Sequence, residues 1–138
     1  MVAFTKYQDT VERLGLAIHD FSAAGHVIKA AIHTDAPVVA TDDELADLTQ
    51  VTGTGYTAGG IDIQNTWAES SGTASMGATD VVWTAGASDW GAARYIALHN
   101  DTSTTDKLVG DWDYGSNFTL VSGETMTVDF GSTVVTLA

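Results

Sequence analysis

The stretch TMTVDF, residues 125–130, alternates polar and apolar side chains at every position. Met126, Val128 and Phe130 fall on one side of an extended chain, and two threonines and an aspartate fall on the other. A period of two residues is typical of a β-strand with one face in a core and the other in solvent. The stretch therefore predicts a half-buried strand.

The stretch RYIAL, residues 94–98, has a different pattern. Apart from Arg94, it is apolar on both of the faces that a strand would present. Strands of this kind are covered on both faces. Residues 94–98 therefore predict a strand in the middle of a sheet.

Most of the chain after residue 25 has the character of short strands. HVIKAAIH (26–33) is one candidate, and it ends at TDAP, which holds the only proline. Further strands are expected at about 51–52, 61–68, 73–84, 92–99, 107–114, 117–121 and 124–137. Turn signals such as YGS separate them. This spacing predicts a mainly β fold, an antiparallel, jelly-roll-like β-sandwich over about 26–138.

One helical period precedes the strands. Six apolar residues recur at intervals of three and four, which places them on one face of a helix. They are Phe4, Tyr7, Val11, Leu14, Ile18 and Phe21. We expect an N-terminal α-helix over about 5–21. A short helix or turn is expected at 41–48, where Thr41 and Glu44 have the spacing of a capping box. The whole chain, 1–138, then forms a single domain.

The stretch GTGYTAGG raises the question of a phosphate-binding loop. Gly53, Gly55, Gly59 and Gly60 fit neither glycine spacing of such loops. A strand pattern follows them, where a phosphate loop would be followed by a helix. We expect a wide turn in which glycine supplies positive φ, with the ring of Tyr56 packed on the sheet.

The amino-acid composition and the net charge exclude several classes of function. The chain has 138 residues, with 5 Lys or Arg against 18 Asp or Glu, for a net charge of −13. Binding to nucleic acid or to an anionic membrane needs clustered cations, so we expect neither. The absence of cysteine excludes disulfides and thiolate metal sites. No signal peptide or membrane span is expected, because no apolar run has the required length.

The polar clusters give no catalytic motif. The four histidines lack zinc-site spacing and are expected at edges or interfaces; they are His19, His26, His33 and His99. The acidic clusters are Asp42, Asp43, Glu44 and Asp47, and Asp111 with Asp113. They match no EF-hand loop, and a looser calcium site stays open as an alternative. Asp111 and Asp113 share a strand face and are expected to pair with Arg94 or Lys107.

The four tryptophans fall into two groups. Trp67, Trp83 and Trp112 lie within predicted strands and are expected in the core. Trp90 lies in the Gly- and Ala-rich stretch AGASDWGAA and is the best candidate for an exposed aromatic that contacts a partner. The alternative is that Trp90 anchors its loop to the core.

Several stretches together resemble a family of small acidic virion proteins from tailed bacteriophages and prophages. They are FTKYQDTVERLGLAIHDF, ADLTQVTGTGYTAGG, ARYIALHNDTSTTDKLVGDWDYG and VSGETMTVDF. The resemblance implies a head decoration (cement) protein, on the outer surface of the virion head. It would bind the major capsid protein and stabilise contacts between capsomers after assembly in the host cytoplasm.

The resemblance also implies an oligomer and leaves one alternative. Local threefold positions of an icosahedral shell favour a homotrimer. The alternative is a tail, neck or fibre component that recognises a host-surface glycan. Both functions are adhesive, so we expect no enzyme activity, no cofactor and no resident metal.

Partner contacts are expected from the chain start and from two loops, because chain ends act as arms and loops on a rigid sandwich carry function. The expected contact residues are Val2, Phe4, Tyr7, Gly53, Gly55, Tyr56 and Trp90.

Overall fold

The computed structural model describes residues 3–138, and antiparallel strands dominate it. The elements are β1 Thr5–Lys6, α1 Thr10–Gly15, β2 Ile28–His33, η1 Leu45–Asp47 (a 3₁₀ turn), β3 Ile61–Asp62, β4 Thr66–Ser70, β5 Thr73–Gly77, β6 Val81–Thr84, β7 Trp90–Asn100, β8 Lys107–Leu120, β9 Thr125–Val128 and β10 Val135–Leu137. The predicted class, a mainly β antiparallel sandwich with one N-terminal helix, is confirmed.

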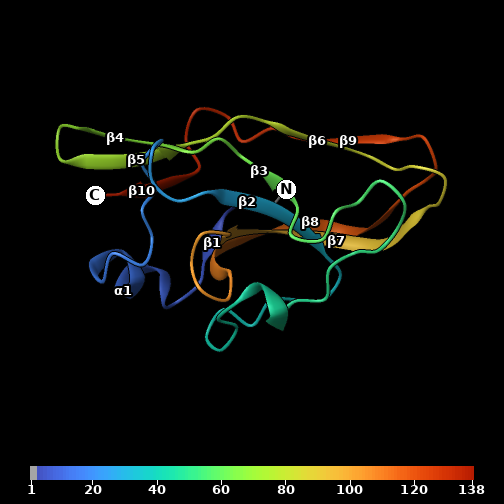
Figure 1. The fold of residues 1–138 in the computed structure, drawn as a ribbon, viewed down its shortest axis with the longest axis horizontal. Helices are drawn as coiled ribbons and strands as arrows, with labels where there is room; N and C mark the ends of the chain where they lie inside the picture. Colours follow the sequence, from blue (N-terminus) through green and yellow to red (C-terminus); the bar gives the residue numbers. More distant parts are fainter. Residues whose placement is uncertain (1–2) are drawn as a thin grey trace.

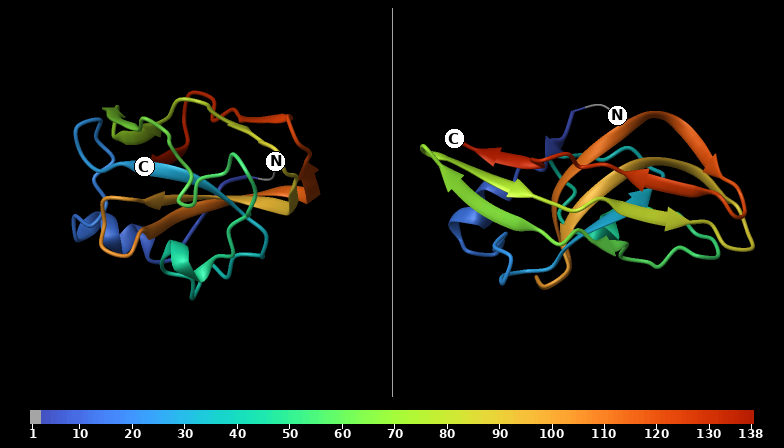
Figure 2. Two further views of the ribbon diagram at one scale, coloured as in Figure 1. Left: turned by 45° about the vertical axis from the view of Figure 1, so that its right-hand side comes forward. Right: turned by 90° about the horizontal axis from the view of Figure 1, so that it is seen from above.

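The strands form two layers, with the helical elements on one outer face. The central sheet has the order β1-β8-β7-β2-β3. Above it in Figure 1 lie two smaller sheets end to end, β10-β5-β4 and β6-β9. α1 and η1 lie below the central sheet. β7 and β8 form a long curved hairpin (Figure 2), and register shifts between them mark the bulges that bend it.

Both faces of the central sheet are buried. The larger apolar cluster lies between the layers and includes Trp83, Ile96 and Leu98. A smaller cluster on the opposite face includes Ala97 and Leu45, which belongs to η1. β7 lies between β8 and β2, so the prediction of a central strand at 94–98 is confirmed. The prediction that residues 125–130 alternate between core and solvent is also confirmed.

The helix is much shorter than predicted. The apolar period indicated a helix over about 5–21, but α1 has 6 residues, and β1 pairs with β8 where the first turn was expected. Phe4 and Tyr7 flank this strand, and their apolar side chains pack against the central sheet rather than on a helix face. The ring centroid of Phe4 lies 4.6 Å from that of Trp112, and Tyr7 is fully buried. After the helix, Ala17 adopts a left-handed φ of 57°.

α1 turns polar residues toward the sheet. Its buried residues are Thr10 and Arg13, whereas Val11, which the period placed in the core, is 49% exposed. The Thr10 hydroxyl donates to the carbonyl of Val109 at 2.7 Å, and Arg13 pairs with Asp43. Hydrogen bonds and an ion pair therefore hold this helix, together with one apolar contact, that of the half-buried Leu14 with the larger cluster.

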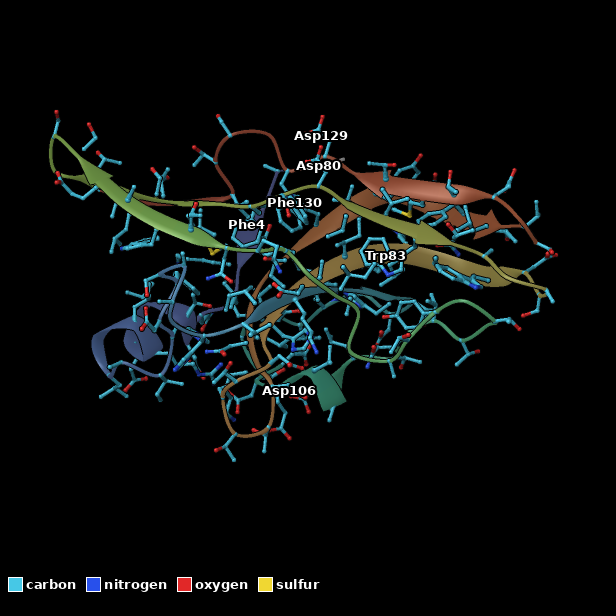
Figure 3. The ribbon with its side chains drawn as sticks, turned by 45° about the horizontal axis from the view of Figure 1, so that its top comes forward. Phe4, Asp80, Trp83, Asp106, Asp129 and Phe130 are labelled. Atoms are coloured by element: carbon cyan, nitrogen blue, oxygen red, sulfur yellow. The ribbon has the colours of Figure 1, made fainter. Side chains whose placement is uncertain are left out.

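Three predicted strands are each divided between two sheets. The segment 61–68 contains β3 and most of β4, 73–84 contains β5 and β6, and 124–137 contains β9 and β10. Where the upper layer is interrupted, the carboxylate of Asp80 accepts the backbone N–H of Phe130 at 3.1 Å (Figure 3). A side chain thus replaces a ladder bond and lets both strands change sheets.

The glycine-rich loop 51–60 is a turn, as predicted. It closes over Trp90, whose indole N–H donates to the carbonyl of Thr54 at 3.0 Å. Tyr56 meets the indole edge-on, with 5.4 Å between ring centroids, and its hydroxyl accepts the backbone N–H of Ile32 at 3.1 Å. The expected packing of Tyr56 on the sheet is confirmed.

Two neighbouring glycines provide a matched test of this loop. Both have positive φ, +90° at Gly59 and +76° at Gly60. A Cβ at Gly60 would lie 1.7 Å from the carbonyl oxygen of Ala30, whereas a Cβ at Gly59 would have no neighbour within 4 Å in the part of the chain that the structure describes. We expect Gly59→Ala to cost about 1 kcal/mol of unfolding free energy, from backbone strain alone. Gly60→Ala should cost about 3 kcal/mol or more, because backbone must move. Urea denaturation measures both, and equal losses would contradict the close approach of the loop to β2.

Candidate functional site

A groove of about 440 Å³ opens between the distal part of β8 and β9. Its apolar lining is Tyr114, Phe118, Leu120, Met126 and Val128. Leu120 and Val128 belong to the larger apolar cluster, so the groove continues the core to the surface. Tyr114 is 47% exposed, and its ring centroid lies 4.9 Å from that of Phe118. The lining combines apolar surface with ready access from solvent.

The backbone beside the groove has open hydrogen-bonding edges. Among residues 3–138, β1 pairs with β8 at Gly110 and Asp111, and Glu44 forms a bridge with Lys107, so β8 from Trp112 to Leu120 has a ladder partner on the β7 side alone. β9 likewise pairs only with β6 in this part of the chain. The expected turn at YGS is wrong, because β8 continues through it, with Gly115 at a φ of 100°. Open edges beside an apolar groove suit the addition of an extended strand.

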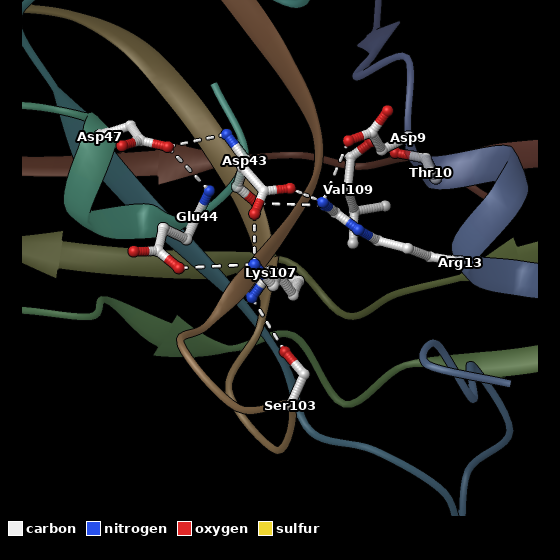
Figure 4. Close-up of polar contacts among 9 residues, drawn as sticks. All are labelled: Asp9, Thr10, Arg13, Asp43, Glu44, Asp47, Ser103, Lys107 and Val109. Carbon is white, nitrogen blue, oxygen red and sulfur yellow. Dashed lines mark hydrogen bonds and ion pairs between the residues drawn. The ribbon is translucent and has the colours of Figure 1, made fainter. Parts of the chain in front are cut away.

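Four of the five Lys and Arg residues form ion pairs within the chain. Arg13 and Lys107 both pair with Asp43 and so join α1, the segment before η1 and β8 (Figure 4). Arg94 binds Asp113 through two hydrogen bonds of 2.8 and 2.9 Å, as the sequence predicted, and these bonds lower the pKa of Asp113 to about 2. Most acidic side chains are left without a cation, so the surface is strongly negative.

The acidic cluster at residues 42–47 is bound by the chain's own donors. Beside the pairs of Asp43, the Glu44 carboxylate lies 3.5 Å from Lys107 Nζ. Asp47 accepts the backbone N–H groups of Asp43 and Glu44 at 2.8 and 3.1 Å (Figure 4). Asp47 and Glu44 form the capping box of η1, so the box predicted from Thr41 is misplaced. These contacts give the calcium alternative no support.

Asp111 belongs to a buried polar network on the lower face of the central sheet. One carboxylate oxygen lies 2.7 Å from Nε2 of His33 and accepts the hydroxyl of Tyr7 at 3.2 Å. Burial raises the pKa of Asp111, although both hydrogen bonds act in the opposite direction. The expected pairing of Asp111 with Arg94 or Lys107 is wrong. The network links the residue that follows β1 to β2 and β8, so the carboxylate has a structural role.

Three of the four histidines, His19, His33 and His99, are buried, so the expectation of edge or interface positions is wrong for them. Asn100 is buried beside two histidines. Its side-chain nitrogen lies 3.1 Å from Nδ1 of His19 and 2.9 Å from Nδ1 of His26. Burial lowers the pKa of His19 to about 4, and the charge of Arg13 acts in the same direction.

The expected exposure of Trp90 is wrong. Trp90 is fully buried and begins β7, and the alternative that it anchors the loop to the core is correct. The same loop contains Gly53, Gly55 and Tyr56. A Cβ at Gly53 would lie 2.2 Å from the indole, and Tyr56 is half-buried, whereas Gly55 is exposed. Only parts of this loop remain open to a partner.

The expected contacts at the chain start change as well. Tyr7 is fully buried and offers no surface, which corrects that prediction, and Phe4 is half-buried against Trp112. Val2 lies outside the described residues. The groove between β8 and β9 was not predicted from the sequence. A two-residue period across 114–120 was the available signal, but the polar residues after Tyr114 suggested a turn.

Comparisons with known proteins give no relative. The chain matches no protein-family model, and no curated protein or solved structure shows significant similarity to it. Across the described residues, none of the helices has the length and apolar character needed to cross a membrane.

Burial of His19 has a testable consequence for stability. The unfolded state gains a proton on His19 near pH 6.5, whereas the folded state gains it only near pH 4. Between these values the unfolded state binds more protons, so the contribution of His19 to stability falls as the pH falls, by on the order of 3 kcal/mol in total.

Between pH 6.5 and 4, the unfolding free energy of His19→Gln should decrease less with falling pH than that of the wild type. Urea denaturation at a series of pH values measures both. Comparing the two chains cancels the contributions of the other titrating groups. Parallel curves for the two proteins would show that His19 is accessible to protons in the folded state.

Proposed function

We propose that this chain is a bacteriophage head decoration protein, which binds the major capsid protein on the outer surface of the virion as a homotrimer. The proposal rests on the resemblance of its sequence stretches to small acidic virion proteins and on the groove between β8 and β9. It acts by adhesion: a protein that binds the assembled shell, and not its free subunits, stabilises the shell.

The open strand edges beside the groove carry this proposal. An extended segment of the capsid protein would add its backbone to the edge of β8 and place apolar side chains against Tyr114 and Phe118. Main-chain hydrogen bonds would supply affinity and the groove would select side chains. Asp129 also lines the groove, and the net charge is −13, so the segment should be poor in acids and carry Lys or Arg.

The alternative, a tail or fibre component that binds a glycan, predicts an exposed Trp90 or Trp67 and a loop site. Trp90 is fully buried, which removes one of these two candidates, whereas Trp67 is half-buried. Copy number in purified particles separates the two functions. Decoration requires on the order of hundreds of copies per particle, because the sites follow the symmetry of the shell, whereas a tail component requires on the order of ten.

Substitution of Tyr114 tests the groove. Tyr114→Asp should weaken binding to particles that lack the chain by about tenfold or more, because it removes an aromatic contact and adds charge. The matched control is Val82→Asp, since Val82 is 53% exposed on β6 but does not line the groove. Sedimentation of particles with bound protein gives the affinity, and circular dichroism verifies folding. Equal binding by both variants would place the contact elsewhere on the surface.

A further inference from the structure

The turn between β7 and β8 gathers three groups that can ligate a metal. A ring nitrogen of His99 and one carboxylate oxygen each from Asp101 and Asp106 lie within 4.8 Å of one another. His99 is the second-last residue of β7 and is fully buried, Asp106 is half-buried, and Asp101 is exposed. The groups therefore run from the protein interior to solvent, which leaves a path of entry for an ion.

His99 is oriented as metal-binding histidines are. Its Nε2 lies 2.8 Å from the carbonyl oxygen of Gly59, which can only accept, so Nε2 carries the proton. Nδ1 then keeps its lone pair, and this buried atom has no hydrogen-bond partner among residues 3–138. Ligating histidines commonly donate their other ring N–H to a carbonyl in this way. Burial also lowers the pKa of His99, which favours the neutral, ligating form.

The turn itself is fixed by hydrogen bonds. The side-chain oxygen of the buried Asn100 accepts the backbone N–H groups of Thr102 and Ser103, both at 3.1 Å. Thr105 and Asp106 adopt left-handed φ values of 64° and 51°. Such φ values are strained for residues other than glycine, and here they return the chain so that Asp106 comes close to His99.

We propose that His99, Asp101 and Asp106 form a binding site for a divalent transition metal, with Zn²⁺ as the best match. One imidazole nitrogen with two carboxylates suits zinc, whereas calcium and magnesium take oxygen ligands. In a tetrahedral zinc site with bonds of about 2.0–2.2 Å, the ligand atoms lie roughly 3.4 Å apart. Zinc binding would require side-chain rotation to bring the ligand atoms from within 4.8 Å of one another to this spacing, with water as the remaining ligand. This site is independent of the proposed function.

Lys29 already supplies positive charge at this place. Its ammonium lies 2.8 Å from a carboxylate oxygen of Asp101, and Lys29 is the strand partner of His99. A bound metal must compete with this ion pair for Asp101. Removing the ammonium should therefore strengthen metal binding, an effect opposite in sign to removal of a ligand.

Zinc titration of the full chain tests the site by calorimetry and thermal unfolding. We expect one Zn²⁺ per wild-type chain and a rise in the unfolding temperature. Asp106→Asn should weaken binding by about tenfold or more, as loss of a ligand requires. Asp129→Asn is the matched control, since it removes the same charge on the opposite side of the molecule (Figure 3). Lys29→Met should tighten binding.

Nuclear magnetic resonance of the imidazole nitrogens identifies the ligand atom. Zinc should shift the ¹⁵N resonance of His99 Nδ1 and leave Nε2 protonated. Zinc bound only by carboxylates elsewhere on the surface would not produce this change. No binding at about 1 mM zinc, well above the range of specific sites, would overturn the proposal. So would equal affinity in Asp106→Asn and Asp129→Asn, or an unmoved Nδ1 resonance. Asp106 is not in the core, so its variant is expected to fold, and circular dichroism verifies this.

Discussion

The β7–β8 hairpin is apolar on both faces, and the rest of the fold serves to cover it. Ile96 and Leu98 face the two small sheets above, whereas Ala97 faces the segment that carries η1 below. A surface of this kind is stable in water only when it is covered on both sides. The two layers, the short 3₁₀ turn and the closed loop 51–60 all follow from this requirement. The hairpin also carries both proposed sites, the groove at one end and the cluster around His99 at the other.

Scarcity of cations shapes the surface that remains. Arg13 and Lys107 act inside the structure, where they hold α1 and the segment before η1 on β8 through Asp43. Arg94 and Lys29 are engaged with Asp113 and Asp101. Because these cations serve as internal ties, the outer surface is left to carboxylates. A partner that binds here therefore has to bring positive charge, and the same holds for a small ion at the β7–β8 turn.

The sequence predicted the features that depend on local periodicity. The alternation at 125–130, the central strand at 94–98 and the turn role of the loop glycines are read from neighbouring residues. It failed where distant residues changed the meaning of a pattern. Phe4 and Tyr7 matched a helical period, yet they are apolar because they meet β8 and its buried network. Trp90 is buried by a loop some forty positions earlier, which no local pattern reports. The approach of Asp106 to His99 depends on left-handed residues that the sequence does not mark as such.

The half-open edge of β8 has a consequence for how copies of the chain meet one another. An unpaired edge can pair with the same edge of another copy, and the two chains then share one continuous sheet. The net charge of −13 opposes that encounter through repulsion. Salt weakens the repulsion, because the screening length falls from about 10 Å at 0.1 M ionic strength to about 3 Å at 1 M. Raising the ionic strength therefore weakens the barrier to edge-to-edge pairing of two copies, and lowering it keeps the chains apart.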